Sequence, residues 1–447
     1  MDRRRFILDL AGAAAAIALA PSLGSGAMRL ARRARPNILL IMSDDLGYGD
    51  LGITGRTDYR TPVIDQIARS GVELTQMYTA APVCTPTRVA LITGRYPART
   101  TAGLYEPLTR QNVGVETDPP TLGLLMKAAG YETALVGKWH LGTFPRFHPL
   151  RHGWDEFYGF LGAGADYASH VDVELRRSLF QDGTRTVRTP GYLTDLFTER
   201  AVRILRRRRS RPLFLNLQYN APHWPWQGPG DPPYPDSASF SSGGSPATYG
   251  RMVESMDTGV GRVLEALHRA GMERDTLVIF TSDNGGERFS HMGPFSAGKM
   301  TLNEGGIRVA AMARWPGVIP AGSRTGQVAV TMDLTATFLA LAGTRAPAAA
   351  PPDGIDLTPA LTGARGGVRR ELVWRISQRR RQKAVRSGDW KYLQKDDGEF
   401  LYDLATDPGE KTDLKLAQPA VFGDLKERLA AWEREVLPPV PLDPAEA

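Results

Sequence analysis

The chain of 447 residues contains a single cysteine, Cys84. One cysteine excludes an intrachain disulfide, and one thiolate on its own makes a poor metal site. The sulfur of Cys84 therefore either packs in the core or takes part in chemistry. The chain also lacks a nucleic-acid-binding signature and a convincing internal repeat. Its net charge of +7 suits anionic partners in general, and no nucleic-acid partner is expected.

The N-terminus lacks an apolar run of comfortable transmembrane length. The apolar residues 7–20 follow three arginines and a phenylalanine at 3–6 and precede the small residues 25–27. Paired arginines before a short apolar run are typical of twin-arginine signals, which export folded proteins. We therefore expect residues 1–27 to be a signal peptide of a bacterial periplasmic or secreted protein with no stable membrane anchor. An uncleaved anchor is the alternative.

Positive charge is concentrated in two short segments, residues 206–211 and 379–383. Such runs are typical of a solvated helix end or loop, and they are also consistent with docking of a polyanionic glycan. Both interpretations stay open from the sequence.

Short β-rich runs alternate with helical stretches, which predicts an α/β fold with a large, mostly parallel sheet flanked by helices. Four runs, residues 37–42, 132–136, 213–217 and 276–280, end in polar side chains. Ligand sites of open parallel sheets lie outside the carboxyl ends of the strands, so these groups should converge on one edge. Any one of them could be only a helix cap, but four together favour a site. The groups are Asp44 and Asp45, Lys138 and His140, Asn220 and His223, and Asp283 and Asn284.

Three helices are predicted between these strands. Residues 62–70 begin with a proline suited to a first helical turn, and residues 121–129 are followed by Gly130, a common helix stop. Residues 249–270 carry a stripe of methionine, valine and leucine, which we assign to core packing rather than to a cofactor.

Asp44, Asp45, Asp283 and Asn284 form an all-oxygen set contributed by two strand ends. Hard oxygen ligands of this kind suit Ca²⁺ or Mg²⁺ better than Zn²⁺ or copper. No segment resembles an EF-hand loop, so the fold must bring these ligands together.

Cys84 stands just before Pro86 and the helical stretch 87–92. A nucleophile at a helix N-terminus faces backbone N–H groups and the positive end of the helix dipole, which favours an anionic attacker and an anionic substrate. Arg88 would lie about one turn away, able to pair with an anion. A buried and inert cysteine is the alternative.

The segment from Cys84 to Arg95, with Pro86 and Arg88 at their spacing from the cysteine, resembles the signature of type I sulfatases of the alkaline-phosphatase-like superfamily. Residues 137–142, Gly-Lys-Trp-His-Leu-Gly, resemble the second signature of that family. There the cysteine is oxidised to formylglycine by a formylglycine-generating enzyme, and the hydrate of this aldehyde attacks sulfate esters. The resemblance implies an alkaline-phosphatase-like fold and a sulfatase that acts on a sulfated small molecule or a sulfated glycan.

The resemblance also implies a divalent metal, usually Ca²⁺, with Mg²⁺ as the alternative. The metal would polarise a sulfate oxygen and hold the aldehyde hydrate in place. The implied ligands are Asp44, Asp45, Asp283, Asn284 and the modified residue at Cys84.

Three cations and three proton-transfer groups receive roles from the resemblance. Arg88 would pair with the hydrate oxygen or the metal ligands, Lys138 would neutralise a substrate or hydrate oxygen, and Lys299 would contact sulfate.

His140 would hydrogen-bond the hydrate and assist its collapse, His223 would donate to the leaving-group oxygen, and Asp283 would act as the base.

A Pro/Ala-rich segment, residues 346–352, looks like a linker or long loop. It divides a predicted catalytic domain, residues 36–350, from a C-terminal subdomain, residues 351–447. The latter resembles the smaller sulfatase subdomain, with an antiparallel sheet and a helix. Its expected strands are 371–375, 383–386, 390–393 and 399–404, its turn is 407–410, and its helix is 421–436.

The motifs specify the family more closely than the substrate. Residues 293–295, before Lys299, resemble arylsulfatases and N-acetylgalactosamine-6-sulfatases, but substrate choice resides in loops such as 144–170 and 224–249. Two alternatives stay open beside a sulfatase. One is a hydrolase of phosphodiesters or phosphonate monoesters that uses the same formylglycine, and the other is a non-catalytic glycan-binding homologue in which Cys84 stays a thiol.

Overall fold

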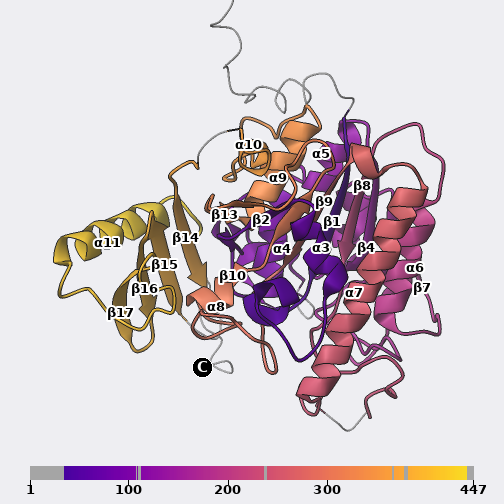
Figure 1. Cartoon of the computed structure of the whole chain (residues 1–447), viewed down its shortest axis with the longest axis horizontal. Coiled ribbons are helices and arrows are strands. Elements are labelled where there is room, and N and C mark those ends of the chain that lie inside the picture. The colour runs from indigo at the N-terminus through magenta and orange to yellow at the C-terminus, as the bar shows by residue number, and fades with distance from the viewer. Residues whose placement is uncertain are drawn as a thin grey trace, which may run out of the picture.

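A ten-stranded sheet forms the centre of the larger part of the protein (Figure 1). The computed structural model describes residues 35–106, 108, 112–235, 239–364, 367–376 and 381–439. The predicted signal peptide, residues 1–27, and residues 379–380 of the second basic segment lie outside them. The strand order is β12-β2-β11-β9-β1-β8-β4-β5-β6-β7. In chain order the strands are β1 (Asn37–Ser43), β2 (Val72–Leu74), β4 (Glu132–Lys138), β5 (Glu156–Phe160), β6 (Phe180–Asp182), β7 (Arg185–Thr186), β8 (Leu213–Gln218), β9 (Thr276–Ser282), β11 (Met312–Arg314) and β12 (Ser323–Thr325).

The five central strands are parallel, as the apolar runs predict. β1 pairs with β8 and β9, and β4 pairs with β8 and β5, all in parallel register. Every residue of β8 and β9 is buried, which explains why these strands are continuously apolar rather than alternating. Short antiparallel strands, β11 beside β9 and β6 beside β5, make the complete sheet mixed.

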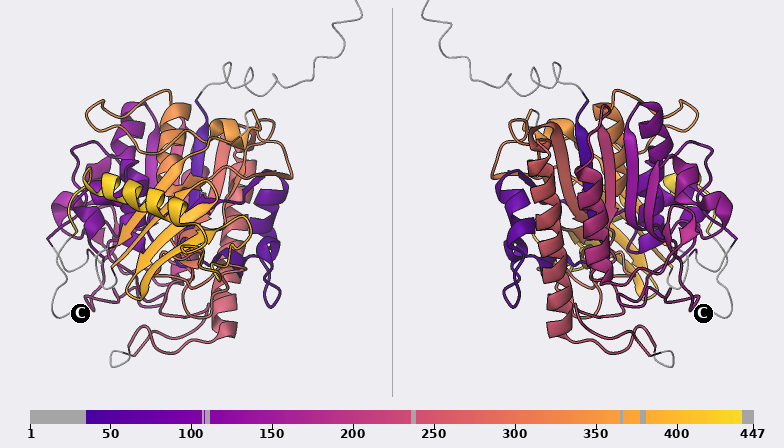
Figure 2. Two further views of the ribbon diagram at one scale, coloured as in Figure 1. Left: turned by 90° about the vertical axis from the view of Figure 1, so that its left-hand side faces the viewer. Right: turned by 90° about the vertical axis from the view of Figure 1, so that its right-hand side faces the viewer.

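Helices cover both faces of the sheet, and the pleat of β1 shows the two layers. Leu39 and Ile41 pack in the core beneath α3, α6 and α7, whereas Ile38 and Leu40 pack in the opposite core beneath α4, α5 and α9. Figure 2 shows α6 and α7 lying across one face of the sheet. The helices are α3 (Pro62–Arg69), α4 (Cys84–Thr93), α5 (Leu122–Ala128), α6 (Leu193–Leu205), α7 (Pro246–Arg269) and α9 (Thr331–Leu341).

The three predicted helices are present as α3, α5 and α7. Helix α7 begins at Pro246, three residues before the predicted start, because Ser245 caps it by accepting a hydrogen bond from the Thr248 N–H. Its apolar stripe packs in the core, as expected.

A smaller unit follows, made of a four-stranded antiparallel sheet in the order β14-β15-β16-β17 and the helix α11 (Figure 1). One face of the sheet packs on α11, through Val385 and Tyr392 against Leu425 and Leu429. Its bounds are β14 (Glu371–Ile376), β15 (Gln382–Ser387), β16 (Trp390–Lys395), β17 (Gly398–Asp403) and α11 (Pro419–Glu433), so each predicted strand is found within two residues.

The other face of this sheet packs on the larger unit. Trp374 and Leu393 share a core with Tyr78, Leu302 and Met332. Between the two units lie a small sheet, β10-β3-β13, and the short helix α8, whereas the short helix α10 packs on the larger unit through Leu361. Their bounds are β3 (Met77–Tyr78), β10 (Arg308–Val309), β13 (Ala329–Val330), α8 (Glu304–Ile307) and α10 (Thr358–Leu361). The domain boundary at residue 350 stays a prediction.

Within the described part of the chain, no helix combines the length and apolar character needed to span a membrane.

Candidate active site

The carboxyl ends of β1, β4, β8 and β9 meet at one edge of the sheet, and the polar residues that follow them lie there together. Each is buried, which is unusual for charged side chains without a function or a partner. The side chains are Asp44, Asp45, Lys138, His140, His223, Asp283 and Asn284. Asn220 was also expected at this edge, but its side chain donates to the Ala165 carbonyl oxygen at 3.2 Å.

Carboxylates from two strand ends form the centre of the site. The backbone N–H of Asp45 donates to Asp283 Oδ1 at 3.2 Å, and Asn284 Nδ2 donates to Asp45 Oδ1 at 2.6 Å. One ligand atom each of Asp44, Asp45, Cys84 and His223 lies within 4.8 Å of the others. The sequence-predicted ligands are thus in one place, although Asp283 directs its second oxygen towards Arg88.

This donor set fits a hard divalent cation. Burial and the neighbouring Asp283 raise the pKa of Asp44 to about 8, against the opposing charges of Lys138 and Arg88. Among the described residues, Asn284 Oδ1 is buried and has no hydrogen-bond partner. A cation would neutralise the carboxylates and satisfy this oxygen, so Asp44, Asp45, Asp283 and Asn284 are the residues that could hold it.

Cys84 is the first residue of α4 and is only 2% exposed. Its Sγ lies 3.4 Å from Asp44 Oδ1, at the centre of the cluster. Burial raises the pKa of the Cys84 thiol well above its ordinary value, although Lys138 and Lys299 oppose the shift. The unmodified side chain is therefore a neutral thiol at physiological pH and a poor nucleophile.

Arg88, one turn further along α4, reaches across to β9 and β8. Its Nη2 and Nε donate to Asp283 Oδ2 at 2.8 and 3.1 Å, and its Nη1 donates to Gln218 Oε1 at 2.9 Å. Arg88 therefore fixes the orientation of Asp283, a geometry consistent with the expected pairing between this arginine and the metal ligands.

Two lysines pair with carboxylates of the cluster. Lys138 Nζ lies 2.6 Å from Asp44 Oδ2, and Lys299 Nζ lies 2.6 Å from Asp45 Oδ2. Burial by itself lowers the pKa of a lysine, but Asp44 raises the pKa of Lys138 and Asp45 raises the pKa of Lys299, and both pKa values end above the ordinary value. Both side chains are therefore cations aimed at the place where an anionic substrate would bind.

His140 lies at the end of β4 in a left-handed conformation, with φ of 54°. Both of its ring nitrogens are buried and lack a hydrogen-bond partner within the described residues; Glu106 Oε1 is 3.7 Å from Nε2. Burial, followed by the charge of Lys138, lowers the pKa of His140 well below its ordinary value. The ring is thus neutral at physiological pH, with one of its two nitrogens unprotonated.

His223 follows β8 and faces Asp45, with Nε2 at 3.7 Å from Asp45 Oδ2. Its Nδ1 lies 2.6 Å from the Trp224 carbonyl oxygen, which can only accept, so Nδ1 carries a proton. Burial and Lys299 lower the pKa of His223 well below its ordinary value. Nε2 is then the nitrogen available for proton transfer.

Three further side chains at the site were not singled out from the sequence. Gln218 binds Arg88, Glu106 accepts the Thr85 N–H at 2.6 Å at the start of α4, and Glu287 lies 3.8 Å from Lys299 Nζ. Gln218 could have been found as the polar residue that ends an apolar strand. Glu106 and Glu287 stand in loops with no local signal.

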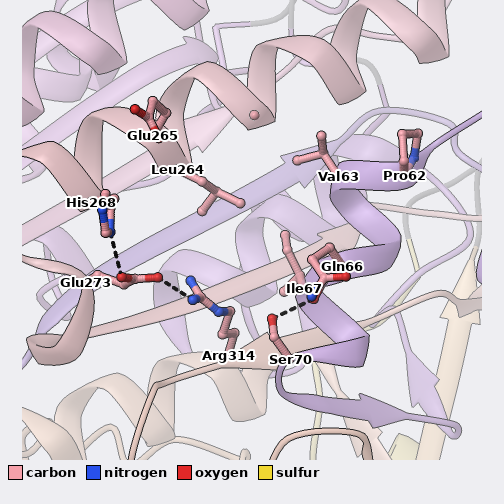
Figure 3. A pocket seen from close by; sticks show the side chains of 11 residues that line it. Pro62, Val63, Gln66, Ile67, Ser70, Leu264, Glu265, His268, Glu273 and Arg314 are labelled. Atoms are coloured by element: carbon pink, nitrogen blue, oxygen red, sulfur yellow. Dashed lines mark hydrogen bonds and ion pairs between the residues drawn. The ribbon is translucent and has the colours of Figure 1, made fainter.

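A groove of about 590 Å³ lies elsewhere, between α3 and α7 (Figure 3). Its polar wall is an ion-pair chain in which Glu273 binds His268, at 2.9 Å, and Arg314. Glu273 precedes β9, whereas Asp283 follows it, so the groove lies at the opposite end of that strand from the carboxylate cluster.

The parallel sheet with a buried carboxylate cluster at its carboxyl edge has the alkaline-phosphatase-like architecture. The family model described as Sulfatase matches residues 36–344. The chain therefore belongs to the sulfatase family, as its two signature segments indicate.

Individual relatives agree with this assignment. N-acetylgalactosamine-6-sulfatase of Canis lupus familiaris is 37% identical over 355 residues, which cover 73% of this chain and 66% of the relative. Arylsulfatase A of Bos taurus is 34% identical over 439 residues, covering 89% and 83%. The solved structure of Ps i-CgsB in complex with k-i-k-neocarrahexaose is 32% identical with a TM-score of 0.84, covering 92% of this chain and 96% of that one.

Proposed function

We propose that the protein hydrolyses sulfate esters of aryl alcohols or carbohydrates, with formylglycine made from Cys84 as the source of the nucleophile and Ca²⁺ as the metal. The position of Cys84 carries this proposal. Its Sγ lies at the N-terminus of α4, beside Asp44, within the charge field of Lys138 and Lys299. A buried neutral thiol has no evident use there, whereas an oxygen nucleophile at this point would face an anionic substrate.

The three cations of the site neutralise the bound sulfate group. Lys138, Lys299 and Arg88 are each paired with a carboxylate, so they are held in place before the substrate arrives. Bound Ca²⁺ would supply Lewis-acid polarisation of a sulfate oxygen. Mg²⁺ is the alternative ion for the same oxygen ligands.

Formylglycine hydrate supplies two hydroxyl groups on one carbon, one for attack on sulfur and one whose deprotonation releases sulfate by C–O cleavage and restores the aldehyde. Asp283 takes the proton of the attacking hydroxyl, and His140 takes the proton of the second. His223 gives a proton from Nε2 to the departing alcohol oxygen. The negative charge of the bound ester favours the protonated form of His223 that this step requires.

Maturation and location complete the proposal. A formylglycine-generating enzyme would oxidise Cys84, and no second thiol in the chain competes for it. Residues 1–27 would then direct the folded protein to the periplasm or the exterior through the twin-arginine route.

The test is co-expression with a formylglycine-generating enzyme, followed by assays of p-nitrophenyl sulfate and bis-p-nitrophenyl phosphate in Ca²⁺. Cys84→Ser is the matched control, since serine lacks the second hydroxyl. We expect sulfate ester hydrolysis that Cys84→Ser abolishes and chelation suppresses. Hydrolysis of the phosphodiester alone would favour the phosphodiester or phosphonate alternative. Inactivity of fully oxidised protein towards aryl and carbohydrate sulfates would contradict the proposal and favour a binding role.

A further inference from the structure

The loop that presents Lys299 contains backbone conformations that its residues do not favour. Ala297 and Met300, on either side of Lys299, have φ of 57° and 69°, in the left-handed region. Non-glycine residues adopt this region at an energetic cost, and they persist there only when the surroundings fix the backbone. The position of Lys299 therefore depends on groups outside its own loop.

Part of the support comes from the larger unit. The Lys299 N–H donates to the Gly286 carbonyl oxygen, and the Met300 N–H donates to the Pro82 carbonyl oxygen, each at 2.9 Å. These bonds connect the loop to the segment after β9 and to the segment before Cys84. Neither bond restrains the stretch from Thr301 to Glu304, which is bound instead by residues of the C-terminal sheet and the turn that follows it.

Gln382, the first residue of β15 in the C-terminal sheet, holds that stretch. Its Oε1 accepts the Leu302 N–H at 2.8 Å, and its Nε2 donates to the Met300 carbonyl oxygen at 3.2 Å. The side chain is 3% exposed, so water does not replace these bonds. One amide group thus fixes the backbone on both sides of Thr301, next to Lys299.

Glu410, in the turn after β17, holds the two ends of the same loop. Its Oε2 accepts from Ser296 Oγ at 2.8 Å, from Asn303 Nδ2 at 3.1 Å and from the Glu304 N–H at 2.7 Å. Its Oε1 pairs with Lys391 Nζ at 2.8 Å.

Lys391 on β16 completes this network from within the C-terminal sheet. Its side chain is fully buried and also binds Glu304 Oε1 at 3.0 Å. A buried charge of this kind is costly unless its partners are fixed, so the network holds Glu410 in one orientation. Figure 1 shows α8, which begins at Glu304, lying beside the C-terminal sheet.

We propose that Gln382 and Glu410 are positioning residues that place Lys299 for sulfate binding, so that the C-terminal subdomain completes the active site. The role of Lys299 towards sulfate rests on the proposed function. The claim that Gln382 and Glu410 hold the Lys299 loop in place rests only on the contacts described above. Gln382 acts through the loop backbone, whereas Glu410 acts through the Glu304 N–H and the side chains of Ser296 and Asn303.

The experiment compares Gln382→Ala and Glu410→Gln with Lys383→Ala as the matched control. Lys383 is the next residue of β15, but it pairs with Glu433 of α11 rather than with the loop. Each full-length, formylglycine-containing variant is assayed with p-nitrophenyl sulfate, titrated with inorganic sulfate, and followed by amide hydrogen exchange of the peptide covering residues 293–303.

For Gln382→Ala we expect faster exchange in residues 293–303 and weaker binding of inorganic sulfate. We also expect a fall in kcat/KM of about tenfold to a hundredfold, mostly through KM, because misplacing a binding cation affects the bound substrate and the transition state alike. Lys383→Ala should stay within about twofold of the wild type. Glu410→Gln should likewise increase exchange and lower sulfate affinity and kcat/KM. If Glu410→Gln does not fold, Gln382→Ala alone provides the test.

Wild-type exchange in the loop of Gln382→Ala would overturn the proposal whatever the enzyme does. Faster exchange together with unchanged kinetics and unchanged sulfate affinity would overturn it as well, since the contacts would then be only structural. An oxidised wild-type protein without sulfatase activity would contradict the proposed function. The exchange data would still show whether Gln382 restrains the Lys299 loop.

Discussion

Asp50 connects the two loops that carry the carboxylate cluster, and Asp50→Asn tests how much that connection contributes. Its Oδ2 accepts the Gly47 N–H at 2.8 Å and the Tyr249 hydroxyl at 2.6 Å, and also binds Ser290. Its Oδ1 accepts the His291 N–H at 2.9 Å. Gly47 follows β1, whereas Ser290 and His291 follow β9.

The cost of the substitution can be worked from these partners. An asparagine amide has one acceptor oxygen, so at least one buried N–H loses its acceptor, at about 1–3 kcal/mol. The ion pair between Asp50 and Arg56, at 3.1 Å, also loses its charge, which adds about 1 kcal/mol. Hydroxyl donors can rotate, so they contribute little. The sum is about 3 kcal/mol, or a fall in Tm of roughly 3 °C for a chain of this size.

The assay is thermal unfolding with and without Ca²⁺, together with a calorimetric Ca²⁺ titration. Asp58→Asn is the matched control, because Asp58 binds the same arginine from a side chain that is 55% exposed. We expect Asp50→Asn to lower both Tm and Ca²⁺ affinity, and Asp58→Asn to change neither appreciably. Equal Tm values for the two variants would refute the reasoning.

Three further predictions concern the chemistry of the site. His223→Asn should reduce turnover far more for an alkyl sulfate than for p-nitrophenyl sulfate, because a good leaving group needs no proton; equal losses would contradict the role of His223. Gln218→Leu removes the side-chain acceptor of Arg88 Nη1 while the bonds of Arg88 to Asp283 remain, so kcat/KM should fall by about tenfold to a hundredfold in steady-state assays, and wild-type kinetics would show that Arg88 needs no support from Gln218. The pKa of Asp44 is raised from 3.8 to about 8, so between these pH values the metal-free folded protein holds a proton that the unfolded chain has lost. The free energy of unfolding of the metal-free protein therefore falls as the pH rises from 3.8 to about 8. Ca²⁺ should displace this proton, so calorimetry in two buffers should detect proton release at pH 7 and none above about pH 9; pH-independent binding would contradict the account.

The central sheet and the edge that carries the site were predictable from the sequence for one physical reason. β1, β4, β8 and β9 are buried on both faces, so each apolar run stops where its strand leaves the sheet. The polar residues that follow must then lie at one edge of a parallel sheet. Asp44, Lys138, His223 and Asp283 were found in this way, although their roles came from the family resemblance.

Contacts that depend on distant parts of the chain could not be predicted. The short strands β6, β7, β11 and β12, towards the two ends of the large sheet, have two or three residues each, too few for a periodic signal. Glu410 was expected only as part of a turn, yet it binds Asn303, 107 residues away. Such pairings follow from the packing of the two units rather than from any local pattern.

The state of Cys84 tests the central claim most directly. A peptide mass spectrum covering this residue, taken on protein purified from its own host, distinguishes the aldehyde from the thiol. The account predicts the mass of formylglycine, or of its hydrate, in place of cysteine. A quantitatively unmodified thiol in protein from that host would contradict the proposed mechanism and leave Cys84 as a buried side chain of a non-catalytic homologue.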